Sequence, residues 1–276
     1  YLGCEFLGWY NGEELLSIEK EYTFTVAYNV TAKFKIKDEM SNFNFNSSVD
    51  TCNIMGLKDK TVSEIIIPDY VTSIDYQAFY GCSGLTSVTI GGSVTSIGNA
   101  AFYNCSSLTS VIWNAENCTS AGSSSYPIFS NCSKLTNVTI GENVKIIPDY
   151  AFEGCSGLTS VTIGNSVTSI GNYAFYNCSG LTSITIPDSV TSIGSESFSY
   201  CSSLTNVTIP DSVIYIGSWA FSACSSLKNI TLPFVGNGKD TNQYPFGYIF
   251  GRNYFYGGLE TKQYYSSSTT YDTYLI

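Results

Sequence analysis

The sequence predicts a repeat solenoid, mainly β with short 3₁₀ or turn segments, and a small β module before it. Three observations lead to this fold class. A 23-residue pattern recurs through most of the 276 residues, every repeat contains an alternating apolar segment, and hydrophobic residues make up 43% of the chain. A single short repeat cannot bury its apolar side chains alone, so stacked neighbours must complete a continuous core.

A leucine that returns at a nearly constant interval marks the repeats. Consecutive leucines are 23 residues apart, except for one interval of 27 residues that makes the repeat at 108–134 irregular. The positions are Leu85, Leu108, Leu135, Leu158, Leu181, Leu204 and Leu227. A unit at 65–84 lacks only the leading leucine, so we expect the solenoid to span residues 65–233.

Each repeat begins with a segment that is typical of a half-buried strand. In L-T-S-V-T-I at 85–90, Val88 and Ile90 alternate with polar residues and therefore share one face. Ser87 and Thr89 fall on the opposite, outward face. The alternation predicts one strand per repeat with an apolar inner side and a hydroxyl-rich outer side.

The rest of each repeat returns the chain to the start of the next coil. A Gly-Gly or Pro-Asp pair follows the strand and is typical of a turn. A V-T-S-I segment then brings Val94 and Ile97 inward as a second short extended segment. An A-F-x-x-C junction closes the coil with a tight or 3₁₀-like turn that carries Phe102 and Cys105 into the core.

The L-T-S-V-T-I strand, the S-V-T-S-I-G step and the A-F-x-x-C-S-x-L junction together resemble the BspA-like class of leucine-rich repeats, over about residues 60–235. That class is found in surface proteins of gut and oral bacteria and of a protozoan parasite. The resemblance implies a leucine-rich repeat fold, a curved right-handed solenoid with a parallel β-sheet on its concave face. It also implies a location at the cell surface or outside the cell.

The first 64 residues do not follow the 23-residue register. Residues 1–39 contain alternating stretches at 22–26 and 30–34, which predict a small β module. Its G-W-Y at 8–10 and its closing V-T-A-K-F resemble part of the internalin-type (Listeria–Bacteroides) β-repeat. We expect residues 40–64 to form an irregular first coil that serves as the N-cap, because an open solenoid end exposes core side chains.

The register is lost again in the last segment, 234–276, which is dense in Tyr, Phe and Gly. Two interpretations remain open for it. The segment is either an insertion or loop that folds over the last coil as a C-terminal cap, or an aromatic-rich binding loop.

The charge composition excludes several partners. The chain carries 12 basic and 22 acidic residues, for a net charge of −10. Binding to nucleic acid needs clustered Lys and Arg, so no nucleic-acid partner is expected, and an anionic membrane surface is disfavoured for the same reason. No run of about 20 apolar residues occurs, so no membrane insertion is expected.

Ten cysteines are present, and seven of them share one repeat position. These are Cys82, Cys105, Cys132, Cys155, Cys178, Cys201 and Cys224. Equivalent side chains in stacked coils run parallel, whereas disulfides need converging Cβ atoms, so we expect a ladder of free buried thiols. Cys4, Cys52 and Cys118 lie outside the ladder and are the candidates for a disulfide.

The residues for catalysis and metal binding are missing from the pattern. The chain has no histidine and no C-x-x-C pair, which argues against His-assisted nucleophiles and against a metal site. Its acidic residues recur in turns, as Asp188 and Asp211 do in repeated P-D pairs. No phosphate-binding glycine motif appears. We therefore expect no enzyme, no catalytic residue and no cofactor.

The outward face of the predicted sheet is the candidate binding surface. One column consists of Ser87, Ser110, Asn137, Ser160, Ser183, Asn206 and Asn229. The next column consists of Thr89, Ile112, Thr139, Thr162, Thr185, Thr208 and Thr231. These columns are either a solvated face that satisfies β-propensity or an uncharged platform for a ligand. Trp113 and Tyr126 flank the irregular insertion and would form a local site where the repeat symmetry breaks.

These features favour a non-catalytic binding or adhesion module of a secreted or cell-surface protein. Its partner would be a protein or glycan of a host or neighbouring cell. The alternatives are a structural spacer or stalk, or an accessory glycan-binding domain of a larger extracellular protein. A large exposed aromatic patch would favour binding, and a uniformly polar sheet face would favour the spacer.

Overall fold

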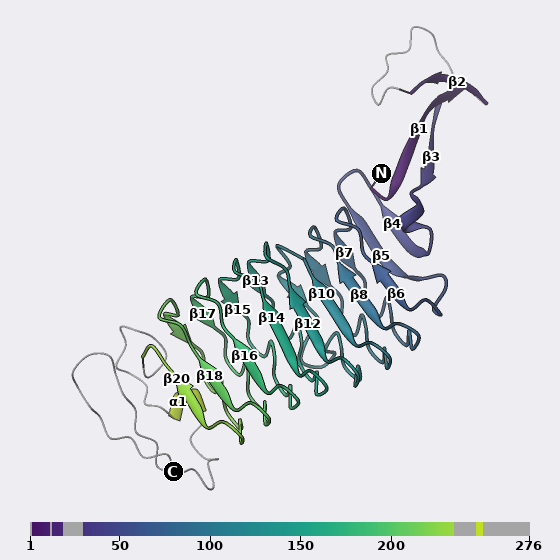
Figure 1. Cartoon of the computed structure of the whole chain (residues 1–276). Helices are drawn as coiled ribbons and strands as arrows, with labels where there is room; N and C mark the ends of the chain where they lie inside the picture. The colour runs from purple at the N-terminus through teal and green to yellow at the C-terminus, as the bar shows by residue number, and fades with distance from the viewer. Residues whose placement is uncertain (1, 12, 19–29, 235–246, 251–276) are drawn as a thin grey trace.

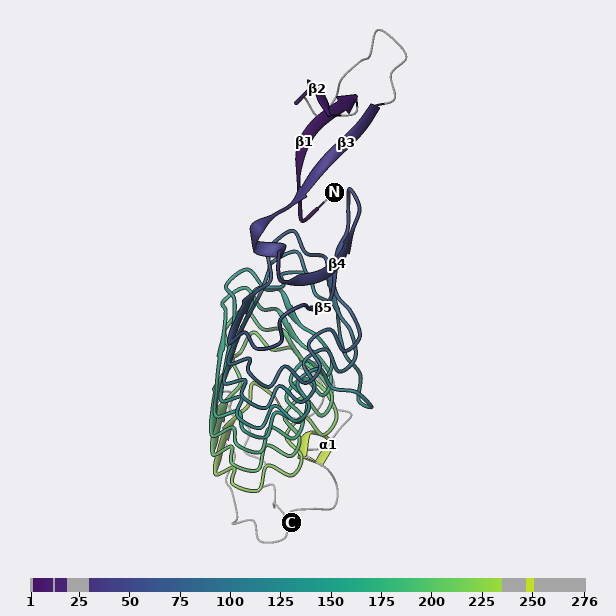
Figure 2. The same ribbon diagram turned by 90° about the vertical axis from the view of Figure 1, so that its right-hand side faces the viewer.

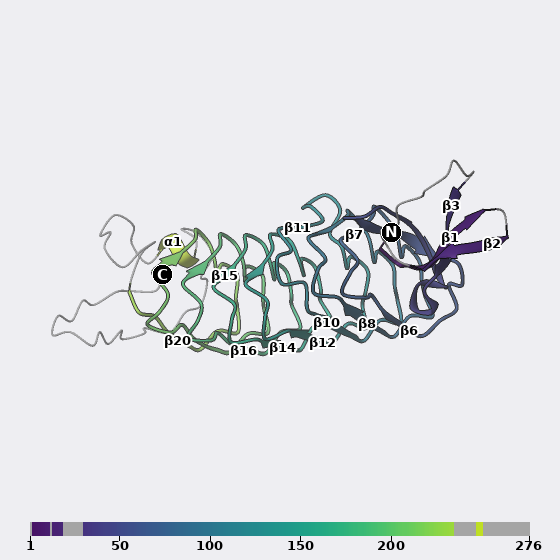
Figure 3. The ribbon, with the colours of Figure 1, turned by 90° about the horizontal axis from the view of Figure 1, so that it is seen from above.

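In the computed structural model, which describes residues 2–11, 13–18, 30–234 and 247–250, the chain forms a long stack of coils (Figure 1). A small separate sheet projects from the N-terminal end of the stack. Seen along the stack, the coils superpose as nested loops (Figure 2). The longer strands run along one side and the short strands along the other (Figure 3).

The longer strands form a parallel sheet that confirms the predicted solenoid. Five are hydrogen-bonded in sequence order: β6 (Glu64–Ile66), β8 (Ser87–Ile90), β10 (Ser110–Trp113), β12 (Asn137–Ile140) and β14 (Ser160–Ile163). Three more continue the face: β16 (Ser183–Thr185), β18 (Asn206–Thr208) and β20 (Asn229–Thr231). Equivalent residues pair, as Val111 does with Val88 and Val138, so each repeat column is a physical column.

The V-T-S-I segments form a second, narrower set of parallel strands. They are β7 (Ser73–Ile74), β9 (Ser96–Ile97), β11 (Ser120–Ala121), β13 (Ile146–Ile147), β15 (Ser169–Ile170), β17 (Ser192–Ile193) and β19 (Tyr215–Ile216). They fall into two separate sheets, with the division between β11 and β13, at the irregular repeat. The four additional residues of that repeat therefore displace the short-strand side while β10 and β12 stay paired.

A glycine follows five of the seven short strands, and coil stacking explains it. A Cβ on Gly194 would lie 2.5 Å from the backbone nitrogen of Asn172 in the preceding coil. A separation under about 3 Å between non-bonded backbone atoms is repulsive, so only glycine allows the coils to approach this closely. The glycine that ends the S-V-T-S-I-G segment is the residue that makes this close contact.

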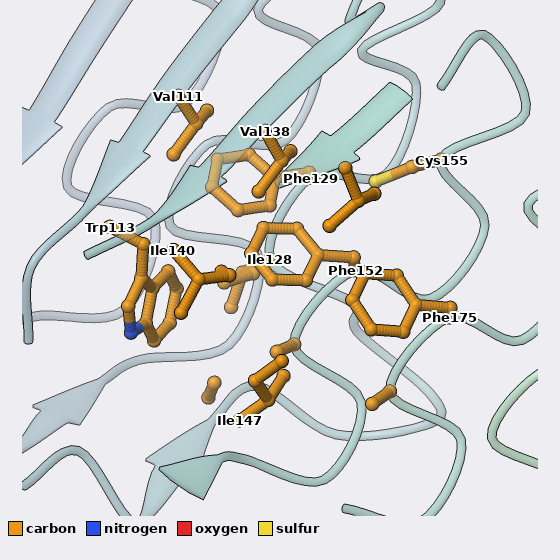
Figure 4. Packing of buried hydrophobic residues seen from close by; sticks show 14 of the residues in the cluster. Val111, Trp113, Ile128, Phe129, Val138, Ile140, Ile147, Phe152, Cys155 and Phe175 are labelled. Carbon is orange, nitrogen blue, oxygen red and sulfur yellow. The ribbon is translucent and has the colours of Figure 1, made fainter. Parts of the chain in front are cut away.

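The core contains a continuous ladder of phenylalanine rings. Its members are Phe79, Phe102, Phe129, Phe152, Phe175, Phe198 and Phe221. Neighbouring rings stack with centroids 4.8 to 5.7 Å apart, and each ring is almost completely buried. Figure 4 shows three of these rings in line behind the inward valines and isoleucines of the sheet. Each ring contacts its neighbours in the coils above and below, which makes the core one body.

The N-terminal module is a three-stranded antiparallel sheet of β1 (Cys4–Asn11), β2 (Glu14–Ser17) and β3 (Val30–Ile36), in the order β2-β1-β3. Residues 22–26, predicted as a strand, lie outside the described residues. The short 3₁₀ helix η1 (Asp38–Met40) joins the module to the stack. There the Lys37 ammonium lies 4.2 Å from the Tyr70 ring centre, and the Tyr70 hydroxyl donates to Glu39 at 3.0 Å.

The prediction of an irregular first coil at 40–64 was wrong. β4 (Phe43–Ser47) and β5 (Cys52–Leu57) form an antiparallel hairpin, and β5 pairs in parallel with β7. The hairpin covers the unpaired edge of β7, and Met40 and Ile54 are completely buried over the first coil. Phenylalanine alternates with asparagine in F-N-F-N at 43–46, and a terminal hairpin needs only one apolar side.

The last described segment is the short helix α1 (Gly247–Phe250). Its Ile249 and Phe250 are buried in the core, and the Phe221 amide donates to the Ile249 carbonyl at 3.1 Å. In the coil before, the Phe198 amide donates to Ala220 at 2.8 Å in the same way. Ile249 and Phe250 therefore take the place that the next Ala-Phe pair would take. The rest of 235–276, and with it the choice between a cap and a binding loop, lies outside the described residues.

Candidate binding surfaces

The outward face of the long strands carries the two predicted columns. Ser110 pairs with Ser87 and Asn137, and Thr162 pairs with Thr139, so the columns are continuous across the coils. Most of their side chains are exposed, and Ile112 is an apolar exception at 43% exposure. The face presents hydroxyl and amide groups with few apolar side chains, which is the property that favours a spacer.

A hollow of about 730 Å³ interrupts this face at its C-terminal end. Thr185, Asn206, Thr208 and Thr231 line it, together with the P-D turn residues Pro210 and Asp211. It lies over β16, β18 and β20, whose strands are one residue shorter than β14. Proline after the strand has no amide to donate, so the ladder ends one residue earlier in these coils.

The acidic residues of the turns mainly join one coil to the next. Asp69 accepts the Gly92 amide at 2.8 Å, and Glu142 accepts the Asn165 amide at 3.0 Å. A second hollow of about 460 Å³ lies beside these two carboxylates at the irregular repeat. Because each of them already accepts an amide 23 residues further along, they act in stacking.

The predicted local site at Trp113 and Tyr126 is not a single exposed site. Trp113 is completely buried and its ring packs edge-on against Phe152 at 5.5 Å (Figure 4). Its position continues the inward alternation of β10, which reads Val111 inside, Ile112 outside and Trp113 inside. The prediction was wrong because the symmetry break was given more weight than this alternation. Tyr126 is 52% exposed, but it lies in the turn that leads to Phe129.

A second surface, which the sequence reasoning missed, lies along the turns that carry the phenylalanine ladder. We call it the aromatic ledge and define it by Tyr150, Tyr173, Tyr176, Tyr200 and Trp219. Tyr150 stacks on Tyr173 at 5.2 Å, Tyr173 contacts Tyr176 at 5.5 Å, and Tyr176 contacts Tyr200 at 5.4 Å. The signal was present in the residues around each A-F-x-x-C junction, where tyrosine or tryptophan recurs in four consecutive repeats, from Tyr150 to Trp219.

Two glutamates accompany the aromatic ledge. Glu196 accepts a hydrogen bond of 2.7 Å from the Tyr173 hydroxyl, which helps to raise the pKa of Tyr173 to about 12. Burial, together with the negative charge of Glu196, raises the pKa of Glu153 to about 7. One oxygen of Glu153 is enclosed and has no hydrogen-bond partner among the described residues. The carboxyl group is therefore poised to change its charge near neutral pH.

The cysteine ladder lies in the core, and its thiols act as weak donors. Cys105, Cys132, Cys178, Cys201 and Cys224 donate to phenylalanine carbonyl oxygens of the preceding coil at 3.1 to 3.3 Å. Burial raises the pKa of Cys155 and of Cys224 to about 12, which disfavours the reactive thiolate. Cys4, Cys52 and Cys118, the disulfide candidates, are free thiols as well.

Two further properties concern the described part of the chain only. No group of three or more Cys, Asp or Glu side chains there is arranged to hold a metal ion. No helix in that part is long and apolar enough to cross a membrane.

The fold and its outward surfaces define a solenoid repeat protein, in which stacked coils hold extended faces toward the solvent. A family model of the BspA type leucine rich repeat region matches in 6 copies at residues 53–145 and 125–248. The chain therefore belongs to the family of BspA-type leucine-rich repeat proteins. Proteins of this kind generally have structural or binding roles rather than enzymatic ones.

Three solved structures illustrate what the chain is similar to. The leucine-rich repeat protein of T. pallidum is 24% identical, with 69% of this chain and 79% of that chain covered and a TM-score of 0.46. A leucine-rich cell surface protein from Faecalibacterium prausnitzii A2-165 is 26% identical, with 70% and 75% covered and a TM-score of 0.43. The pneumococcal vaccine antigen PcpA is 13% identical, with 71% and 88% covered and a TM-score of 0.35. A search of curated proteins finds no match.

Proposed function

We propose that this chain is a non-catalytic adhesion module, displayed outside the cell, that binds a protein or glycan of a host or neighbouring cell. The observation that carries the proposal is the gathering of exposed aromatic rings on one stretch of turns. Tyr200 is 51% exposed and Trp219 is 50% exposed, on a scaffold whose core is already complete without them. Exposed aromatic side chains that packing does not require are typical of recognition surfaces.

The family and the chemistry of the chain support the same role. One similar structure is described as a cell surface protein and another as a vaccine antigen, which supports an extracellular location. The chain lacks histidine, and the turn carboxylates with resolved partners bond to backbone amides, which supports a function without catalysis. The two columns of the sheet face, with the hollow over β16 to β20, are a second candidate surface for the same role.

A structural spacer is the second candidate function, and the sheet face is the observation that favours it. Most side chains of the two columns are exposed hydroxyl or amide groups, with Ile112 as an apolar exception, and Ile66, which pairs with Thr89, is exposed beside them. A stiff stack with such a face would hold another domain away from the cell without binding anything. The two candidates differ in one respect that can be measured, which is saturable binding.

The test is binding of the purified full chain to cultured host cells, to matrix proteins and to a glycan array. The adhesion module is expected to bind at least one of these targets saturably, and unlabelled chain should compete with it. Absence of saturable binding to every target would reject the adhesion module and leave the spacer. A hydrolytic or transferase activity on any bound target would reject the non-catalytic part of the proposal.

A further inference from the structure

The aromatic ledge spans four consecutive coils, and ring contacts join its members through the first three. Ring contacts join Tyr150 to Tyr173, Tyr173 to Tyr176 and Tyr176 to Tyr200. The amide of Tyr200 donates to Ser222 at 2.8 Å, and Ser222 in turn donates to the Trp219 carbonyl at 3.0 Å. Tyr200 and Trp219 thus occupy adjacent coils at the C-terminal end of the ledge.

The backbone at these positions is unfavourable for large side chains. Tyr150, Tyr173, Tyr200 and Trp219 have φ values of 61°, 56°, 60° and 58°, in the left-handed region. For a non-glycine residue this region is energetically unfavourable. Other coils use glycine, asparagine or alanine at the position of Tyr200, namely Gly81, Asn104, Asn131, Gly154, Asn177 and Ala223. Tyr200 therefore stands where the other coils place a small or amide residue. Tyr150, Tyr173 and Trp219 belong to a different column, in which other coils place Gln77, Ala100 and Glu196, also with positive φ.

Core packing does not explain these residues, because the rings with the greatest exposure gain little from burial. About half of the Tyr200 side chain and half of the Trp219 side chain remain exposed. The inward positions of the same turns are already filled by Phe198 and Phe221, which are completely buried. A strained backbone that holds an exposed ring points to recognition as the reason for the ring.

The polar groups around the rings accept and donate hydrogen bonds, and the coils that carry the rings supply no basic residue of their own. No lysine or arginine occurs between residues 146 and 227, whereas Glu153 and Glu196 both lie at the ledge. An anionic ligand would meet these carboxylates without any cation to hold it. A ligand rich in hydroxyl groups could instead donate to the free carboxylate oxygens and receive from the tyrosine hydroxyls.

We propose that the aromatic ledge is a carbohydrate-binding site that takes a neutral oligosaccharide of pyranose units. The aliphatic C–H face of a pyranose packs on an aromatic ring, while its hydroxyl groups bond to carboxylate and amide side chains at the rim. Tyr200 and Trp219 supply the exposed ring surface, and Glu196 supplies the acceptor. The inference deepens the proposed adhesion function by naming its ligand class, and it rests on that function.

Other ligand chemistries fit the ledge less well. A quaternary ammonium or lysine side chain is held by rings that enclose a common point. The rings of the ledge follow one another along the stack instead, with Tyr150 and Tyr173 only 13° from parallel. A protein partner would favour a broader apolar centre, whereas the ledge carries the carboxyl groups of Glu153 and Glu196 beside its rings.

The test uses the full chain against immobilised cello-, malto-, manno- and chito-oligosaccharides, with sialylated and sulfated oligosaccharides as anionic comparisons. The variant Tyr200→Asn restores the asparagine used by other coils, and Trp219→Gln inserts the residue that Gln77 supplies in the first coil. Both variants are expected to fold. The control Tyr80→Ala removes a tyrosine of similar exposure, 43%, that lies outside the ledge.

The expected result is binding of at least one neutral oligosaccharide, weakened about tenfold or more by each ledge variant and unchanged by the control. Equal binding by wild type and both ledge variants would place the site elsewhere and overturn the inference while the adhesion function stands. Binding to matrix proteins with no neutral oligosaccharide bound would assign the surface to a protein partner. Binding to no cell, protein or glycan would reject the adhesion function itself.

Discussion

The phenylalanine ladder and the aromatic ledge lie in the same turns of the same coils, one facing inward and the other outward. The inward ring is present in every coil from Phe79 to Phe221, and its stacking is nearly uniform. The outward rings differ from coil to coil: Tyr80 stacks on Tyr103 in the N-terminal coils, and four of the five ledge rings in the C-terminal coils, all but Tyr176, have a left-handed backbone. Uniformity marks what the stack needs to fold, and departure from it marks residues that folding does not explain.

The largest effect is expected from the interior. Phe175→Ala should lower the free energy of unfolding by about 3–5 kcal/mol, because it removes a buried ring that contacts both neighbours and leaves a cavity. Denaturant titration followed by circular dichroism measures the change. Thr162→Ala on the exposed sheet face is the control, with an expected change within about 0.5 kcal/mol. Equal effects of the two substitutions would contradict the comparison.

Coil spacing gives the next largest effect. Gly194→Ala should destabilise by about 1–3 kcal/mol, since the new Cβ would press on the backbone of Asn172. Gly92→Ala is the matched control, because its new Cβ would lie 3.6 Å or more from its nearest neighbours. Thermal unfolding of both variants measures the difference. A Gly194→Ala protein as stable as Gly92→Ala would show that the coils can separate without penalty.

The thiol ladder should contribute less than the rings. Cys201→Ala removes a sulfur from the core and a hydrogen bond of 3.3 Å to the Phe175 carbonyl. We expect a loss of about 1–2 kcal/mol in the free energy of unfolding. Unfolding of the variant under reducing conditions measures it, with Ser202→Ala in the adjacent, partly exposed position as the control. A stabilised variant would mean that the ladder is not a packing feature.

The stability of the folded chain should depend on pH through Glu153, which lies at the ledge. Glu153 has its pKa raised to about 7 in the folded chain, from the ordinary value of 4.5. Between these values the folded chain holds a proton that the unfolded chain has lost, so stability falls as pH rises through this window and is constant above it. Glu153→Gln should abolish this fall, which amounts to about 1 kcal/mol once solvent screening of a half-buried group is allowed for.

Melting temperatures from pH 4 to pH 8 measure the effect of Glu153→Gln. Asp211→Asn, at an exposed turn outside the ledge, is the control. If the melting temperatures of the wild type and of Glu153→Gln depend on pH in the same way between pH 5 and pH 7, the raised pKa of Glu153 is contradicted.

The smallest change is expected where the aromatic residue serves recognition. Tyr200→Asn relieves a left-handed tyrosine and loses one edge contact with Tyr176, so the free energy of unfolding should change by no more than about 0.5 kcal/mol. Differential scanning calorimetry measures it beside the oligosaccharide assay. A decrease of more than about 2 kcal/mol in the free energy of unfolding would show that Tyr200 serves packing.

Much of the fold could be predicted because every repeat shows the same alternation of buried and exposed residues and nearly the same length. Alternation in Val88 and Ile90 set the inward side of the strand, and the regular return of leucine set the coil length. The burial of Trp113 also follows from the alternation of β10, in which Val111 and Trp113 share the inward side. Local periodicity determines which side of a strand is buried, so the sequence alone contains that information.

The tertiary structure alone decided what stands side by side on the outside. Tyr176 and Tyr200 are 24 positions apart and belong to different columns of the repeat, yet their ring centroids lie 5.4 Å apart. The hairpin that contains F-N-F-N is likewise defined by a tertiary contact, because its strand β5 pairs with the edge of β7. Contacts between coils depend on backbone conformation at single positions, and a periodic pattern does not specify them. The sequence thus determined the stack and its interior, and the structure decided the ledge.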